Sequence, residues 1–492
     1  MPRVLSAAAL VAALLVVPVA RAAPSDYTAG APVVASPAAS PLPDPCPFQA
    51  ENPPTQVNYL STEVEPQVAV NPTNPRNVIG VFQQDRWSDG GAHGLLAAAS
   101  FDGGASYVNR WAEFSRCSDK PETPFFEPLP RATDPWVSFD AAGRAYQIAL
   151  PIINGQLSDS AVTASHSEDG GLTWSQPVDL TRDADPTGVV FNDKQSITAD
   201  PQVAGRAYAT WIRGELPGEE MSFAKLAHAF SYRGLPVFSK TTDGGVTWST
   251  PTPMTNANVY AQGNQIAVLP DGTLLNVQAV LFKGSGVQPS KNAVFMAVQR
   301  STDGGKNWSP AIKIAPLRVS AEAADGRPLR VGDYLPDIAV DRRSGSVYVT
   351  WADNQGGSTN KIVLSRSTDG GKTWSTPAVV SHHGGAQSFN HAVAVANDGE
   401  LAALYYDVAR NTPDPGIPTD VYLRHSGDGG RTWSAPQLLY SFDFANAPVS
   451  RGLFLGDYMG LEAVGSNGLI AFFSVTDATP ESANVISIRL TR

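Results

Sequence analysis

The chain has 492 residues, of which 16% are charged, and its formal net charge is −11. Nucleic acid and anionic membrane surfaces are therefore not expected as partners, because both would repel so acidic a chain. The 43 glycines and 40 prolines, together with sparse helical periodicity, predict an all-β protein with many turns.

The first 22 residues have the features of a secretory signal peptide. Arg3 supplies the positive charge, residues 4–19 are nearly all apolar, and Ala20-Arg21-Ala22 is an A-x-A cleavage site. No other segment approaches the roughly 18 apolar residues that a membrane span requires. The sequence therefore predicts an exported extracellular protein with no membrane span.

Residues 23–55 are rich in Pro, Ala and Ser and have neither helical nor strand periodicity, which predicts a largely disordered leader. Residues 56–492 are expected to form a single domain. The two cysteines, Cys46 and Cys117, are a disulfide candidate in an exported chain, and the bond would tie the leader to the first repeat unit. No Cys/His cluster has the spacing of a zinc site.

One nine-residue segment recurs through the domain. STDGGKTWS at 367–375 is repeated at 167–175, 241–249, 301–309 and 426–434, and a degenerate copy begins at Ser100. Asp-Gly-Gly is typical of a tight turn between strands, since glycine adopts positive φ and Asp accepts bonds from nearby N–H groups. Repeats at near-regular intervals predict a repeat architecture.

This segment resembles the Asp box (BNR repeat) of sialidases and related β-propellers. The resemblance implies four-stranded blades with each box between the third and fourth strands, on the face away from the active site. The boxes are then structural. Their aspartates are Asp102, Asp169, Asp243, Asp303, Asp369 and Asp428, and their tryptophans are Trp174, Trp248, Trp308, Trp374 and Trp433.

A pattern of two strands precedes each box and also occurs once more near the C-terminus. Seven strand openings for six boxes predict seven blades, although sialidases mostly have six, which is the alternative. The last unit ends in a third strand at 484–490, so the spare strand Val57–Leu60 is expected to close the ring beside it.

In a blade, the start of the first strand and the end of the second lie on the face opposite the boxes. Concave propeller mouths are the default place for a ligand site. The predicted catalytic residues there are Asp134, Asp333, Tyr334, Asp457 and Tyr458, and the predicted substrate-binding residues are Glu65, Arg86, Asp193, Arg213, His391 and Arg410. Crowded acids suit general acid and base roles in glycoside cleavage, or the binding of calcium; taken singly, each is more simply a loop cap.

The resemblance implies a more detailed site, with three arginines that bind the substrate carboxylate, a Tyr–Glu nucleophile pair and an Asp acid/base. Arg86, Arg213 and Arg410 are the candidates for the arginines, and Tyr334 or Tyr458 for the nucleophile. The chain departs from the family at the first inner strand, where Glu65 stands in place of the arginine of an Arg-Ile-Pro motif.

Two functions are compatible with these features. The acid and tyrosine residues favour a secreted glycoside hydrolase of exo-α-sialidase type that acts on extracellular glycans. The missing Arg-Ile-Pro motif favours a non-catalytic propeller that binds a glycan or a protein on the same face. Either would be a monomer that requires no cofactor, with calcium as the one candidate metal.

Overall fold

A computed structural model of the chain describes residues 26–44, 46, 56–118, 129–152, 159–184, 190–215, 233–256, 259–283, 294–320, 322–323, 326–382, 387–409, 412 and 415–492. Regular structure in these ranges is β-strand, apart from two short 3-10 turns at Arg116–Ser118 and Phe444–Asn446. The predicted all-β class is confirmed.

Most strands belong to seven antiparallel meanders, which follow one another along the chain. They are β3–β6 (Asn58–Val70, Val78–Trp87, Ala92–Ser100, Val108–Arg110), β7–β10 (Arg131–Phe139, Ala145–Ile152, Asp159–Ser167, Val178–Ala184), β11–β14 (Val190–Ala199, Ala207–Glu215, Arg233–Thr241, Thr252–Pro253), β15–β18 (Val259–Val268, Leu274–Lys283, Phe295–Ser301, Ile312–Pro316), β20–β23 (Asp337–Val340, Val347–Asp353, Lys361–Ser367, Ala378–Val379), β24–β27 (Ser388–Val395, Leu401–Val408, Pro418–Ser426, Gln437–Asp443) and β29–β31 (Gly460–Val464, Gly468–Thr476, Ala483–Thr491).

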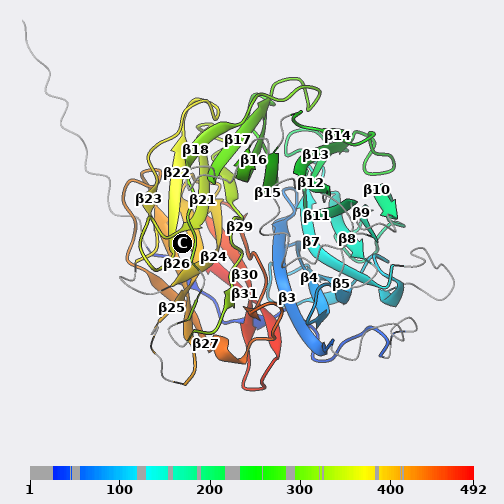
Figure 1. Cartoon of the computed structure of the whole chain (residues 1–492), viewed down its shortest axis with the longest axis vertical. Coiled ribbons are helices and arrows are strands. Elements are labelled where there is room, and N and C mark those ends of the chain that lie inside the picture. The colour runs from blue at the N-terminus through cyan, green and yellow to red at the C-terminus, as the bar shows by residue number, and fades with distance from the viewer. Residues whose placement is uncertain are drawn as a thin grey trace, which may run out of the picture.

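The first strands of the meanders pack against one another around the middle of the molecule (Figure 1). Each first strand contacts the first strand of the next meander, in the order β3, β7, β11, β15, β20, β24 and β29. The last of them, β29, contacts β3 again. Apolar clusters fill the spaces between adjacent sheets; one joins Val81 and Ala97 of the first meander to Val137 of the second. The core is therefore divided among the interfaces between sheets.

Each repeated nine-residue segment forms the turn after the third strand of a meander. In the fifth meander, the Ser367 hydroxyl donates to Asp369 Oδ1 at 2.8 Å, and the same oxygen accepts the N–H groups of Lys372 and Thr373 at 3.0 Å. The hydroxyl-to-aspartate bond recurs at Asp102, Asp169, Asp243, Asp303 and Asp428. The six aspartates hold turns, as the sequence predicts.

The tryptophans of these turns are half-buried between neighbouring sheets. Trp374 packs against Val277 and Met296 of the preceding meander and against Trp351 of its own. Trp174, Trp248, Trp308 and Trp433 pack against apolar clusters in the same way. Each box thus joins its own sheet to the one before it.

The boxes also contact the hairpins that follow the inner strands. The Gly103 N–H donates to Arg76 O at 2.8 Å, and the Asn77 side chain donates to Gly170 O at 3.0 Å. The boxes and these hairpins therefore share one face. Because the inner strands run toward that face, their first residues lie at the opposite one.

The seventh sheet is completed by the leader. Two short strands, β1 (Thr28–Ala29) and β2 (Val33–Val34), pair with β31. The predicted closure by Val57–Leu60 is wrong: residues 58–60 belong to β3 and pair with β4, where Asn58 lies opposite Trp87. Because β1 and β2 of the leader occupy the edge of β31, that edge is not open to residues 57–60.

The prediction of a disordered leader is also wrong for the part that the structure describes. Tyr27, Ala35 and Leu42 are buried, with 3%, 1% and 6% of their surface exposed. The remainder of residues 23–55, and the predicted signal peptide, lie outside the described residues. Two-residue strands are too short to show periodicity, which is why the sequence gives no sign of them.

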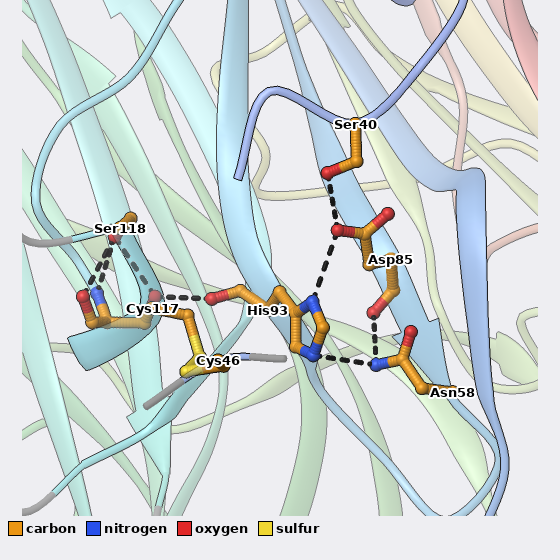
Figure 2. The surroundings of a disulfide bond; sticks show 8 residues. Ser40, Cys46, Asn58, Asp85, His93, Cys117 and Ser118 are labelled. Carbon is orange, nitrogen blue, oxygen red and sulfur yellow. Dashed lines mark hydrogen bonds and ion pairs between the residues drawn. A yellow bond between two sulfur atoms is a disulfide. The ribbon is translucent and has the colours of Figure 1, made fainter. Parts of the chain in front are cut away.

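Cys46 and Cys117 form the expected disulfide (Figure 2), with 5.4 Å between their Cα atoms. Beside it, the Ser40 hydroxyl of the leader donates to Asp85 Oδ2 at 2.5 Å, and the same carboxylate contacts His93 Nδ1 at 3.2 Å. The leader thus runs from the last sheet to the first and is fixed at both ends.

Candidate active site

Five inner strands in the described ranges have an irregular bend at the face opposite the Asp boxes. The register of β3, β7, β11, β15 and β24 shifts there, and in the first three of these strands the bend holds a charged residue. Within the shifts, Glu65, Asp134 and Lys194 have φ of 57°, 55° and 49°. Positive φ is uncommon and unfavourable for residues that carry a Cβ, and such strain is concentrated at functional sites. These three bends bring one charged side chain from each strand together.

The ammonium group of Lys194 lies among three carboxylates. Its Nζ is 2.6 Å from Asp457 Oδ2, 3.2 Å from Asp134 Oδ2 and 3.6 Å from Glu65 Oε1. None of these four side chains is more than 11% exposed. Burial disfavours the charge on Lys194, but Asp134, Asp457 and Glu65 outweigh it and raise its pKa.

Asp457 is bound by a second cation. Arg330 donates from Nε to Asp457 Oδ1 at 3.0 Å and from its terminal nitrogen to Oδ2 at 2.5 Å, a bidentate pair. Arg330 lies in β19 (Leu329–Arg330), which pairs with β28 (Leu453–Phe454) just before Asp457. Burial would raise the pKa of Asp457, yet Arg330 and Lys194 hold it well below its usual value.

Arg86, at the end of β4, is 2% exposed and has neutral hydrogen-bond partners. Its guanidinium donates to Gln83 Oε1 at 2.6 Å and to Ser450 Oγ at 3.1 Å, and it pairs with no carboxylate in the described part of the chain. It lies 4.7 Å from the centroid of the Phe454 ring, and Arg330 lies 4.0 Å from it. Burial and the charge of Arg330 lower the pKa of Arg86 to about 10.

A third arginine, Arg451, lies near Arg330. Burial and the positive charge of Arg330 lower the pKa of Arg451. Arg86, Arg330 and Arg451 therefore form a positive group next to the acids. Arg86 in this group is buried with neutral hydrogen-bond partners, and a buried cation of that kind is suited to an anionic ligand.

The carboxyls of Glu65 and Asp134 differ in their affinity for protons. Burial, followed by the charge of Asp134, raises the pKa of Glu65 to about 8. Burial would also raise the pKa of Asp134, but Lys194 and a hydrogen bond with Glu65 lower it. Glu65 is thus protonated and Asp134 ionised near neutral pH. Neighbouring carboxyls with opposed pKa shifts are typical of acid/base pairs in enzymes.

Two neutral side chains orient this pair. The Gln83 amide donates to the Glu65 carboxyl and, at 2.7 Å, to Thr133 Oγ1, whose hydroxyl donates to Asp134 Oδ1 at 2.8 Å. The other oxygens, Glu65 Oε1 and Asp134 Oδ2, lie 3.6 and 3.2 Å from Lys194 Nζ. Both face Lys194, where a substrate hydroxyl or water could approach.

The predicted residues Glu65, Arg86, Asp134 and Asp457 are thus neighbours, and two further acids lie close to them. Burial and the charge of Asp457 raise the pKa of Asp333 to about 6. Burial raises the pKa of Asp193 to about 6, while Lys194 opposes the shift. The two tyrosines are less suited to attack: Tyr458 donates its hydroxyl to Pro135 O at 3.1 Å, and Tyr334 packs in an apolar cluster.

The remaining predicted residues do not join the cluster. Arg213 forms ion pairs with Asp183 at 2.9 Å and with Glu215 at 3.7 Å, and its side chain is 37% exposed. These acids, and not those of the cluster, are its partners. Burial lowers the pKa of His391 to about 4, so it is neutral and cannot supply a proton near neutral pH. Arg410 lies outside the described residues.

The sequence reasoning missed Lys194, Arg330 and Arg451. Lys194 follows Asp193 in a predicted strand opening, and alternation along a strand would send neighbouring side chains to opposite faces. The bend with positive φ brings Lys194 into the centre instead. Two Gly-Asp-Tyr triplets occur at 332–334 and 456–458. Arg330 and Arg451 precede them by only a few residues, which is the one signal that could have pointed to these arginines.

The described residues contain no group of three or more His, Cys, Asp or Glu side chains arranged to hold a metal ion. The acids of the cluster have Lys194 and the arginines as their counter-charges. Within the same ranges, no helix has the length and apolar character needed to cross a membrane.

A cavity of about 670 Å³ opens on the other face, along the inner strands below the cluster. Its lining runs from Gln67 and Trp136 to the hairpins at Asn71, Asn397 and Ser466, with small apolar side chains between them. The residues of the charged cluster do not line this cavity. The candidate active site is therefore the cluster and not the cavity.

Known proteins share these features in part. The family model described as BNR/Asp-box repeat matches residues 299–310. A sialidase from Bacteroides fragilis (strain YCH46) is 30% identical over 189 residues, which are 33% of this chain and 32% of that protein. The match therefore spans about a third of the length of this relative. The chain carries BNR/Asp-box repeats and is sialidase-like in part of its sequence.

Solved structures of glycosidases have similar arrangements of strands. The Hadza microbial sialidase Hz136 has a TM-score of 0.48 at 15% identity, over 84% of this chain and 74% of that one. An α-L-arabinanase from Penicillium chrysogenum has a TM-score of 0.45 at 12% identity, over 73% and 93%.

Proposed function

We propose that the chain is an exported glycoside hydrolase of the sialidase-like class, with the charged cluster as its active site. The seven meanders would be the blades of one closed seven-bladed propeller, and the cluster would lie at its mouth. The repeats and the partial similarity to a sialidase support the class. The Cys46–Cys117 disulfide supports export, since such bonds persist in oxidising compartments.

The observation that carries this proposal is the Glu65–Asp134 pair beside Arg86. Glycosidases generally combine a protonated carboxylic acid with an ionised carboxylate. Glu65 would protonate the leaving-group oxygen, and the Asp134 carboxylate would act as base or nucleophile. Tyr458 fits the nucleophile role less well, because burial and the nearby carboxylates raise its pKa well above the ordinary value.

The substrate would be an extracellular glycan whose terminal sugar bears a carboxylate. Arg86 is the side chain best placed to bind that group, because its present partners are neutral oxygens. An exo-α-sialidase is the leading form of this proposal. The reaction needs no cofactor in this scheme, so activity should persist in EDTA, and the protein would act as a monomer.

Turnover of a panel of aryl glycosides that includes a sialoside tests the proposal. Glu65→Gln and Asp134→Asn should each lower kcat at least about a hundredfold, since acid/base catalysis contributes about 10²–10⁴. Asp102→Asn, in an Asp box on the other face, is the control and should leave kcat unchanged. If the wild-type protein cleaves none of the sugars, the hydrolase proposal is wrong.

A non-catalytic glycan-binding protein is the second candidate. The close ion pairs of Asp457 and the hydrogen-bonded hydroxyl of Tyr458 favour it, because they leave these two groups engaged within the protein. A glycan array would then show binding that Arg86→Met abolishes, without hydrolysis of any bound glycan.

A further inference from the structure

Lys194 is a charged residue of the cluster that neither the family resemblance nor the acid/base scheme explains. Its ammonium group contacts carboxylates that come from β3, from β7 and from the segment before β29, three places far apart in the chain. Its own backbone is in the left-handed region, with φ of 49°. Such a backbone conformation is costly for a residue with a Cβ and is concentrated at functional sites, which makes Lys194 a candidate for a specific role.

The three contacts are unequal, and their order separates the acids. Nζ is nearest to Asp457, then to Asp134, and farthest from Glu65, at 2.6, 3.2 and 3.6 Å. Glu65 receives a neutral donor instead, the Gln83 amide. The ammonium charge is therefore directed chiefly to two of the three carboxyls.

Other charged groups also lie near Lys194. Asp193, on the same strand, adds a fourth negative group, and Arg330, Arg86 and Arg451 add positive ones. The Tyr458 ring centroid is 5.9 Å from Nζ. Arg330 is committed to Asp457 through two bonds and reaches Glu65 only at 4.0 Å. Lys194 Nζ lies 3.2 Å from Asp134 Oδ2, whereas Arg330 and Arg86 form no ion pair with Asp134 in the described structure.

We propose that Lys194 is the positioning residue of this site, whose ammonium group keeps Asp134 and Asp457 ionised and in place so that the remaining proton resides on Glu65. This rests on the proposed function where it concerns catalysis. The arrangement itself is a property of the resting protein and can be tested without a substrate.

The direct test follows the ionisation of Asp134 by NMR in protein labelled with ¹³C at the aspartate side-chain carboxyls. Asp134→Asn identifies the signal. Lys194→Met should raise the midpoint of Asp134 titration by about one pH unit or more, the usual effect of losing an opposite charge at this distance. Lys194→Arg, which keeps the charge, should restore most of the wild-type midpoint. An unchanged midpoint in a folded Lys194→Met protein overturns the proposal.

Two further variants guard against failure to fold and against nonspecific effects. Asp457→Asn with Lys194→Met removes one charge of each sign, and comparison with Asp457→Asn alone isolates the effect of Lys194. Lys240→Met is the matched control, because Lys240 is bonded to Gly304 O at 2.7 Å on the Asp-box side; it should leave the midpoint unchanged. A rise of equal size in Lys240→Met would overturn the specific role.

Kinetics separates this inference from the proposed function. If the protein is a hydrolase, the acidic limb of its pH–kcat profile, which reports Asp134, should move to higher pH in Lys194→Met and return in Lys194→Arg. A wild-type protein that cleaves no glycoside refutes the hydrolase proposal but not the role of Lys194, whereas an unchanged Asp134 midpoint in Lys194→Met refutes the role of Lys194 whatever the activity.

Discussion

Glu63 and Glu65 stand two residues apart on β3, and both are buried acids with raised pKa. Burial raises the pKa of Glu63 from 4.5 to about 8, while the Gln84 amide, which donates to it at 2.8 Å, opposes the shift. Glu63 lies outside the charged cluster, so its titration reports the cost of burying a carboxylate without catalytic consequences.

Glu63 should make the protein less stable as pH rises. Its folded-state pKa is raised, so its contribution to the free energy of unfolding is complete below about pH 4.5 and is lost as pH approaches about 8. Glu63→Gln should flatten this part of the curve. Thermal unfolding of both proteins between pH 4.5 and 8 is the measurement, and parallel curves would contradict the assignment.

Several site residues could be predicted because charged residues at the starts of repeated strands must emerge on one face. The sequence predicts in this way that Glu65, Asp134 and Asp457 share one face. The position of Lys194 cannot be predicted so, since its direction depends on a backbone bend that strand alternation does not encode. The prediction of Arg213 as a substrate-binding residue meets a related limit, because position in a repeat does not reveal that Asp183 lies close enough to pair with it.

Among the elements, the Asp-box turn is the one most fully encoded in the sequence. Its Asp, Gly-Gly and Trp each have a local role, and local roles can be predicted from short segments. The strands β1 and β2 are the opposite case, since they exist only because β31 offers them an edge. The Asp-box turns and the first two strands of each meander can therefore be predicted from the sequence, whereas β1 and β2 cannot.

Trp374→Ala should lower the free energy of unfolding by about 3 kcal/mol, the lower end of the range for a large aromatic side chain, because Trp374 is half-buried. Chemical denaturation measures this loss. Lys372→Ala, in the same turn but exposed, is the control and should change stability by less than about 0.5 kcal/mol. Ligand binding at the cluster should persist in both variants; its loss at unchanged stability would give the box a functional role.

The molecule as a whole is held in register by the leader, which completes the seventh sheet and reaches the first through Cys46. Cys46→Ser with Cys117→Ser opens a cross-link between residues 71 apart in sequence, and should cost about 4 kcal/mol in the chain-entropy account. Reducing agent should destabilise the wild type by a similar amount and leave the double variant unaffected. Equal stability of the two proteins would show that the leader is held without the bond.

The charged cluster lies at the starts of the inner strands and the cavity lies along them toward the Asp-box face, so a bound ligand can be assigned to one or the other. A crystal structure of the Asp134→Asn protein with a bound sialoside is the most direct measurement. We predict that the sugar lies at the charged cluster, with its carboxylate bonded to Arg86 and its glycosidic oxygen next to Glu65. A sugar bound in the cavity on the Asp-box face, or none at the cluster at saturating sialoside, would contradict the assignment of the site.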